Sequence, residues 1–183
     1  MIIGGGIGRL AAAIALQRVG IEAAVFEKTP QIAEVGAGLS LWSNAMVALR
    51  RLGLEEPALK AGSVIERTRT FLSTGEVFGS VDFAALGEKA GAASICLHPA
   101  ALQQLLLDAT RAGDPQSVQI GRECIGFAEN TAEVCARFSD GSSERGDVLI
   151  GADGITPSSA ANSSAWKDLA SQGISHGAAL LSE

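Results

Sequence analysis

Apolar positions near the start of the chain form two kinds of segment. Residues 21–27 are an almost continuous apolar run, which predicts a parallel strand covered on both faces. Residues 1–3 are a short apolar stub of the same kind. Between them, residues 7–19 are rich in Ala, Leu and Ile and predict a buried helix that Gly20 ends. The pattern therefore predicts a β-α-β unit at the start of the chain.

The middle of the chain predicts a mixture of helices and strands. Ser43 is expected to cap a helix that Gly53 ends. The turn Ser73-Thr74-Gly75 predicts a β-hairpin. The remaining expected elements are a helix over 43–52, strands over 64–72, 76–83 and 95–97, a small-residue loop over 84–94, and a helix over 99–111 that begins at Pro99.

The pattern changes after residue 121, because strands now follow one another without helices between them. Strands are predicted over 122–129, 132–138 and 145–150, with turns at Asn130 and Ser139-Asp140-Gly141. These strands form a β-meander that ends at Gly151-Ala152-Asp153-Gly154. Ser and Ala dominate residues 156–183, which we expect to be a poorly ordered tail with at most a weak helix over 165–171.

Composition excludes several classes of function. The chain has 183 residues, 47% of them hydrophobic, and a net charge of −6, so a folded core is expected and nucleic acid is not an expected partner. Three cysteines without a C-x-x-C pair and two separated histidines predict neither a disulfide framework nor a metal site. We find no transmembrane segment and no signal peptide, and we expect a cytoplasmic protein. Its oligomeric state is left open.

Glycines at the turn between the first strand and the helix indicate a dinucleotide cradle. Such glycines let a pyrophosphate approach the backbone at a helix N-terminus, and an acidic residue after the second strand binds ribose. Glu27 follows these glycines at a spacing close to the expected value of about 20 residues. Gly4-x-Gly6-x-x-Arg9 has Arg9 where a third glycine is usual, whereas the register Gly6-x-Gly8-x-x-Ala11 ends on a small residue. The sequence leaves both registers open.

Several segments together resemble the FAD-dependent aromatic hydroxylases, the family of para-hydroxybenzoate and salicylate hydroxylases. The segments that carry this resemblance are Ile3-Gly4-Gly5-Gly6-Ile7-Gly8, Val25-Phe26-Glu27-Lys28, Gly36-Ala37-Gly38-Leu39, His98-Pro99-Ala100-Ala101-Leu102-Gln103, and Asp140-Gly141-Ser142 running into Gly151-Ala152-Asp153-Gly154. Their order and spacing agree with the family over residues 1–155.

The resemblance implies an α/β protein with a three-layer, Rossmann-like FAD-binding fold, a parallel sheet and a β-meander crossover. Residues 1–155 would be the FAD-binding domain, and 64–97 would begin an incomplete substrate domain with a β-hairpin. Family members use NADH or NADPH to reduce FAD and then hydroxylate a small aromatic substrate with oxygen. The implied cofactor-binding residues are Gly4, Gly5, Gly6, Ile7, Gly8, Glu27, Lys28, Gly38 and Asp153. We name no catalytic residue, because the flavin is the reactive centre.

Departures from the family pattern keep three hypotheses open. Arg9 replaces a glycine, Pro99 stands where the family usually has an arginine, and no arginine follows Asp153. Family-like sequence stops at Ile155, as expected of a truncated or frameshifted gene product. The chain is accordingly the FAD-binding part of a monooxygenase, a nicotinamide-dependent Rossmann oxidoreductase, or a non-catalytic nucleotide-binding remnant. The meander opposes the second hypothesis, because further β-α-β units would be expected in its place.

Overall fold

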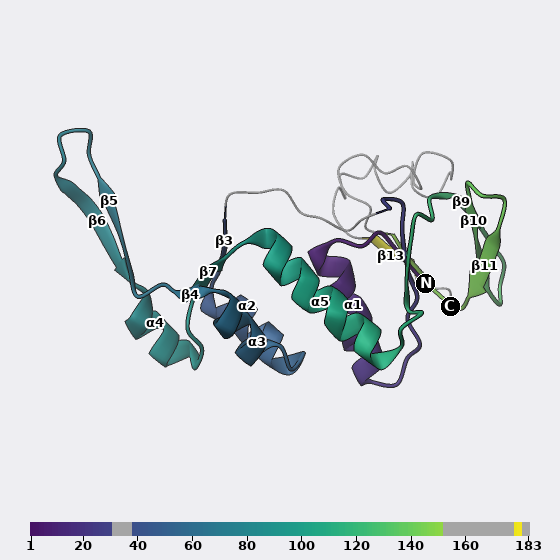
Figure 1. The fold of residues 1–183 in the computed structure, drawn as a ribbon, viewed down its shortest axis with the longest axis horizontal. Coiled ribbons are helices and arrows are strands. Elements are labelled where there is room, and N and C mark those ends of the chain that lie inside the picture. The colour runs from purple at the N-terminus through teal and green to yellow at the C-terminus, as the bar shows by residue number, and fades with distance from the viewer. Residues whose placement is uncertain (31–37, 152–177, 181–183) are drawn as a thin grey trace. The chain divides into compact units, whose positions relative to one another are not determined.

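A computed structural model describes residues 1–30, 38–151 and 178–180 (Figure 1). The chain divides into two compact units, one formed by residues 1–32 and 107–183 and the other by residues 33–106. Helix α5 (Pro99–Gly113) begins in the second unit and ends in the first. The expected tail, the weak helix over 165–171 and Asp153 lie outside the described residues, apart from strand β13 (Ala178–Leu180).

A five-stranded sheet forms the centre of the first unit, in the order β13-β12-β1-β2-β8. Strand β1 (Ile2–Ile3) pairs in parallel with β2 (Val25–Glu27) and with β12 (Leu149–Gly151), and β2 pairs in parallel with β8 (Val118–Ile120). Helix α1 (Ile7–Arg18) connects β1 and β2. The predicted β-α-β unit and parallel sheet are therefore confirmed.

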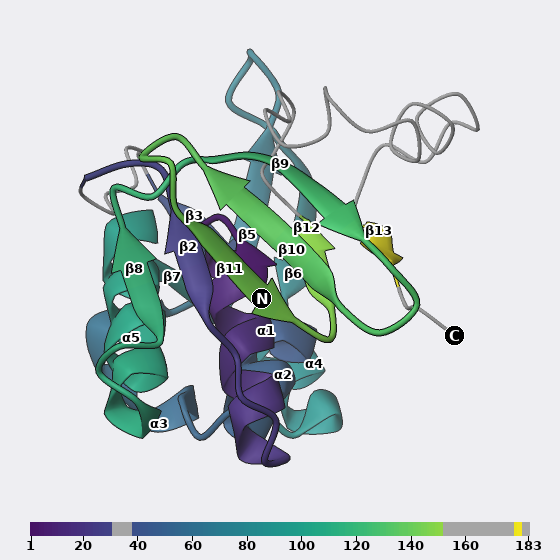
Figure 2. The same ribbon diagram turned by 90° about the vertical axis from the view of Figure 1, so that its right-hand side faces the viewer.

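Successive side chains on each strand point to opposite faces of this sheet, so that apolar side chains are buried on both faces. Ile3 and Phe26 are register partners and belong to a core cluster with Val134, Ala136 and Phe138 of the meander. Their neighbours Ile2 and Val25 point to the opposite face by strand alternation and are also buried. Leu10, Ala13 and Ile14 form the buried stripe of α1. Helix, parallel sheet and meander are thus the three predicted layers (Figure 2).

The predicted meander is an antiparallel sheet of β9 (Cys124–Glu129), β10 (Val134–Phe138) and β11 (Ser143–Gly146). The single strand expected over 145–150 is wrong, because the chain instead forms β11 and then β12 in a different sheet. Residues 147–148 make this change of sheet. Strand β8 was not expected. The strand predicted over 21–27 forms only at its end, as β2, and Ile21 at its predicted start is 52% exposed.

In the second unit, β7 (Ile95–Leu97) is the central strand of a small antiparallel sheet. It pairs with β3 (Leu39–Leu41) and β4 (Ser63–Val64). Helices α2 (Ser43–Arg51) and α3 (Glu55–Ala61) lie between these strands in the sequence. Ser43 is the first residue of α2 rather than its cap, which is Trp42, and the Ser43 hydroxyl lies 3.3 Å from that of Ser94.

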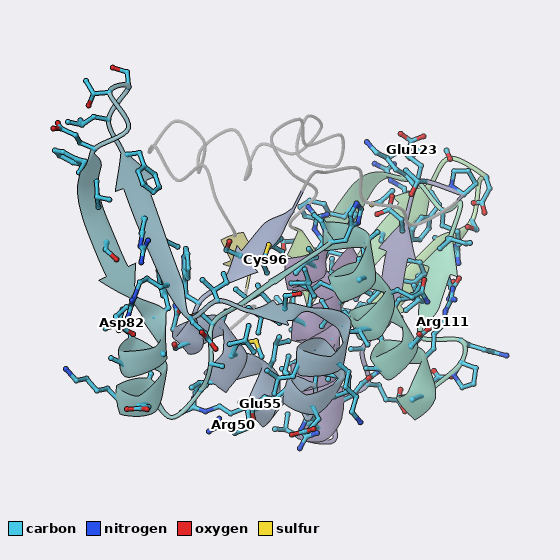
Figure 3. The ribbon with its side chains drawn as sticks, turned by 60° about the vertical axis from the view of Figure 1, so that its left-hand side comes forward. Arg50, Glu55, Asp82, Cys96, Arg111 and Glu123 are labelled. Carbon is cyan, nitrogen blue, oxygen red and sulfur yellow. The ribbon has the colours of Figure 1, made fainter. Side chains whose placement is uncertain are left out.

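The predicted hairpin is confirmed as β5 (Arg67–Phe71) and β6 (Val77–Asp82), with Gly75 at φ 89° in its turn (Figure 1). The loop expected over 84–94 is wrong, because helix α4 (Phe83–Ala90) forms there. Asp82 lies at the foot of the hairpin (Figure 3) and caps this helix by accepting the Ala85 N–H at 3.0 Å. Gly91, at φ 72°, ends it.

Candidate functional site

The glycine turn places its tightest residue at Gly4. Gly4 has φ +102°, a conformation that side-chain-bearing residues rarely adopt, and its N–H donates to the carbonyl of Phe26 at 2.7 Å. Gly6 has φ −74° and is the N-cap of α1. The sharp turn of the motif is therefore at Gly4, which corresponds to the register Gly4-x-Gly6-x-x-Arg9. Gly8 is exposed, and a methyl group built on it would meet nothing within 4 Å.

The N-terminus of α1 has the features of an anion-binding site. No side chain caps this end, and the first turn of the helix contains no acidic residue. The helix dipole and the N–H groups of the first turn therefore favour a negatively charged ligand at the loop of Gly4, Gly5 and Gly6. Ile7 is the first residue of the helix and is half-buried.

Glu27 ends β2 and reaches back to the glycine loop. One carboxylate oxygen, Oε2, accepts the backbone N–H of Gly5 at 2.5 Å. The other, Oε1, accepts the backbone N–H and the hydroxyl of Thr29 at 2.8 and 2.9 Å. Sequence analysis did not identify Thr29, which donates twice to a carboxylate two positions earlier in the chain.

The pKa of Glu27 reflects opposing effects. Burial alone would raise the pKa, but the hydrogen bonds from Thr29 and Gly5 and the nearby charge of Arg9 outweigh it, so the pKa lies below its ordinary value. Glu27 is consequently a carboxylate at neutral pH, and its two oxygens act as hydrogen-bond acceptors at the end of β2.

The side chain of Arg9 turns back over the glycine loop. A methyl group built on Gly4 would lie 2.6 Å from Nη1 and 2.8 Å from Cζ of Arg9, and one built on Gly6 would lie 3.3 Å from Nη1. The guanidinium thus lies against the bare backbone of two glycines. The absence of side chains at Gly4 and Gly6 leaves room for Arg9 in this position.

A pocket of about 140 Å³ opens beside these residues. It lies between the glycine loop, the end of β2 and the beginning of β9. Its polar and charged lining combines basic and acidic groups from all three segments: Arg9, Glu27, Lys28, Arg122 and Glu123. Of the residues singled out from sequence, Gly4, Glu27 and Lys28 line this pocket. Three basic groups, Arg9, Lys28 and Arg122, offer positive charge to an anionic ligand on this side of the glycine loop.

Arg122 is a lining residue that sequence analysis missed. Its guanidinium lies over the rings of Phe138 and Phe26, at 4.2 and 5.2 Å from their centroids. It also donates to Glu144 at 2.8 Å and to Gln119 at 2.6 Å. Arg122 follows β8, a strand that the sequence did not reveal, so no signal marked it as the end of a parallel strand.

Two further residues predicted from sequence lie elsewhere, in the second unit or outside the described residues. Gly38 belongs to the second unit, where a methyl group built on it would make ordinary contact with Cys96 at 3.7 Å. Asp153 lies outside the described residues. Pro99 is the first residue of α5, as predicted.

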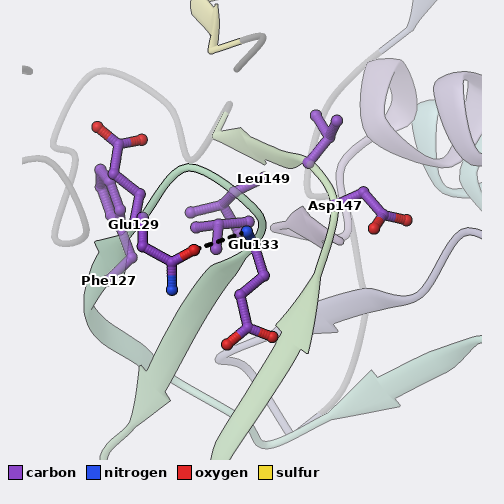
Figure 4. A pocket seen from close by; sticks show the side chains of 8 residues that line it. Phe127, Glu129, Glu133, Asp147 and Leu149 are labelled. Carbon is purple, nitrogen blue, oxygen red and sulfur yellow. Dashed lines mark hydrogen bonds between the residues drawn. The ribbon is translucent and has the colours of Figure 1, made fainter. Parts of the chain in front are cut away.

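A second hollow, of about 20 Å³, lies at the end of the meander (Figure 4). It has room for a water molecule or two and none for a nucleotide. Its acidic groups are Glu129, Glu133 and Asp147. Across residues 1–30 and 38–151, no group of three potential metal ligands gathers, here or elsewhere. The helices that the structure describes include none long and apolar enough to span a membrane.

The fold and the glycine cradle together define a dinucleotide-binding protein, and comparison with known proteins specifies its family. Residues 1–167 match the FAD binding domain family, so the chain belongs to it. The chain is 37% identical over 155 residues to aurachin C monooxygenase/isomerase of Stigmatella aurantiaca and 34% identical over 157 residues to 3-hydroxybenzoate 6-hydroxylase 1 of Aquipseudomonas alcaligenes. Each match covers 85% of this chain and 40% of the relative.

A solved structure supports the same assignment. Klebsiella pneumoniae HpxO complexed with FAD and uric acid is 32% identical and superposes with a TM-score of 0.74, over 86% of this chain and 39% of that one. The chain therefore spans about 40% of the length of the relatives it matches. These findings confirm the predicted family, fold class and FAD cofactor.

Proposed function

We propose that this chain is the FAD-binding part of an NADH- or NADPH-dependent flavoprotein monooxygenase that hydroxylates a small aromatic substrate. The observation that carries the proposal is the hydrogen bond between Glu27 and Gly5, because it joins the ribose-binding and phosphate-binding parts of a cradle within a family of FAD-binding domains. The names of the relatives support the substrate class, since they describe a hydroxylated benzoate and urate.

Each cradle residue receives a role under this proposal. Gly4, Gly5, Gly6, Ile7 and Gly8 would hold the pyrophosphate, with the N-terminus of α1 supplying positive potential. Glu27 would accept hydrogen bonds from the adenosine ribose. A carboxylate has about four acceptor sites, and the three hydrogen bonds from Gly5 and Thr29 leave one available.

Further roles follow for the other predicted residues. Lys28, in the pocket lining, would lie beside the adenosine, Gly38 near the flavin and Asp153 near the pyrophosphate. Bound FAD would supply the redox chemistry and the activation of oxygen, while the protein would orient it and exclude water. Residues 1–155 would be the FAD-binding domain, with residues 64–97 beginning the substrate domain. The proposed cytoplasmic location agrees with Cys96, Cys124 and Cys135 being free thiols.

The nicotinamide hypothesis is less well supported. A Rossmann oxidoreductase would continue with further β-α-β units after β2. Here the described chain enters the antiparallel sheet β9-β10-β11 before returning to the parallel sheet at β12. The turn at Gly4 also removes the argument for the register that ends at Ala11.

Flavin fluorescence tests the proposal directly. We expect the purified chain to bind FAD saturably at micromolar concentration and to bind NAD more weakly by a wide margin. Circular dichroism must first show that the chain is folded. Tighter binding of NAD than of FAD would favour the nicotinamide hypothesis. A folded chain that binds neither would favour the remnant hypothesis. Aromatic hydroxylation would then be tested on a longer protein that contains this sequence.

A further inference from the structure

We propose that Arg9 binds the pyrophosphate of the dinucleotide, so that a cation replaces the third glycine as the distinctive feature of this cradle. The inference rests on the proposed function, because it assigns a role within the same site. Arg9 would be a binding residue whose guanidinium contacts the phosphate oxygens. It would not be an obstruction that the fold merely accommodates.

The position of the guanidinium supports this role. Arg9 is the third residue of α1, and its backbone N–H donates to Gly6 at 3.0 Å. Its side chain folds back along the helix so that Nη1, Cζ and Nε all lie close to Gly4. The guanidinium therefore lies at the N-terminus of α1, where the glycine backbone would bind a pyrophosphate. Only the tip of a flexible side chain must shift to admit one.

Charge gives a second, independent argument. A cation in the first turn of a helix opposes the helix dipole, and the first turn of α1 itself contains no acidic residue. In the described structure the charge of Arg9 acts on the carboxylate of Glu27 across the loop. A pyrophosphate would bring negative charge to both the guanidinium and the helix N-terminus. The planar guanidinium is suited to phosphate because it can donate two parallel hydrogen bonds.

Titration of FAD against four proteins tests the inference: wild type, Arg9→Gln, Arg9→Gly and Arg18→Gln. Arg18 is exposed in the last turn of the same helix, so its variant removes the same charge away from the loop. Each protein is titrated at low and at high salt, after circular dichroism has shown that it is folded. Inorganic pyrophosphate is then used as a competitor of FAD on the wild type.

We expect Arg9→Gln and Arg9→Gly to bind FAD about tenfold more weakly than wild type at low salt, as the loss of one charge-assisted contact implies. The difference should shrink at high salt because exposed charges are screened, and Arg18→Gln should match wild type. Pyrophosphate should displace FAD from wild type.

Two contrary outcomes are distinguishable. If wild type binds FAD while Arg9→Gly binds it equally or more tightly, Arg9 is an obstruction and only this inference fails. If folded wild type binds no FAD, the proposed function fails and the inference fails with it. Should Arg9→Gln not fold, failure of pyrophosphate to compete on wild type would overturn the inference alone.

Discussion

The carboxylate of Glu27 accepts the backbone N–H of Gly5 at 2.5 Å across 22 positions of sequence. This hydrogen bond joins the tip of β2 to the loop between β1 and α1. It fixes the glycine loop and the end of β2, the two segments to which the proposed function assigns FAD binding, relative to each other. This hydrogen bond therefore contributes to the stability of the first unit and holds the glycine loop in place without a ligand.

Replacing Glu27 by Gln should destabilise the chain at neutral pH by about 1–2 kcal/mol, because a charged acceptor of three hydrogen bonds is lost. The effect should depend on pH. The pKa of Glu27 is lowered from 4.5 in the folded state, so its stabilisation is present above pH 4.5 and is lost as the pH falls through the lower folded value. Urea unfolding of both proteins from pH 7 downward measures this. A difference in unfolding free energy between the two proteins that stays constant down to the lowest pH would contradict this pH dependence.

Gly4 lies in the loop before α1 and Gly8 lies in the first turn of α1, so the two glycines form a matched pair for substitution by alanine. Gly4→Ala should destabilise the protein by roughly 1–3 kcal/mol because of its positive φ, and it should also displace Arg9. Gly8→Ala should leave stability unchanged or raise it by up to about 1 kcal/mol, because the residue is helical and its methyl group would meet nothing. Thermal and urea unfolding of both variants provide the comparison. Equal effects would show that the turn is not at Gly4.

Arg122 and Arg145 are arginines associated with the same antiparallel sheet but with different surroundings. The side chain of Arg122 is 17% exposed and lies against two phenylalanine rings, whereas that of Arg145 is 69% exposed and pairs with Glu133. Arg122→Ala should cost about 2 kcal/mol or more through lost packing and hydrogen bonds. Arg145→Ala should cost about 0–1 kcal/mol. Urea unfolding measures both, and a cost for Arg145 equal to that for Arg122 would contradict the assignment.

The hairpin β5-β6 exposes several large apolar side chains, including Phe71, Val77 and Phe78, which is 74% exposed. Exposed apolar surface of this extent favours association. We expect this chain by itself to self-associate or to be poorly soluble, and Phe78→Ser to reduce the effect. Size-exclusion chromatography with light scattering at several concentrations measures this. A monomeric wild type across the range would refute the expectation.

Many local features of the fold could be predicted from sequence because they depend on short-range patterns. The apolar run before Glu27 and the glycine turn defined the β-α-β unit. Turn residues at Asn130 and Gly141 marked the meander. Helix α4 was missed even though Asp82 and Gly91 carry the cap signals, because its small residues resemble a loop. Strand β8 was missed because three residues give too short a pattern to recognise.

The sequence by itself determined the family, the glycine cradle and the acidic residue at the end of β2. Only the tertiary structure decided the register of the motif, the partner of Glu27 and the direction of the Arg9 side chain. The physical reason is the distance along the sequence over which the deciding interactions act. Periodicity and turn chemistry act over a few residues, whereas the positive φ of Gly4 and the path of a long side chain are set by contacts among β1, α1 and β2. The arginine that departs from the glycine motif in sequence lies over glycine backbone in three dimensions.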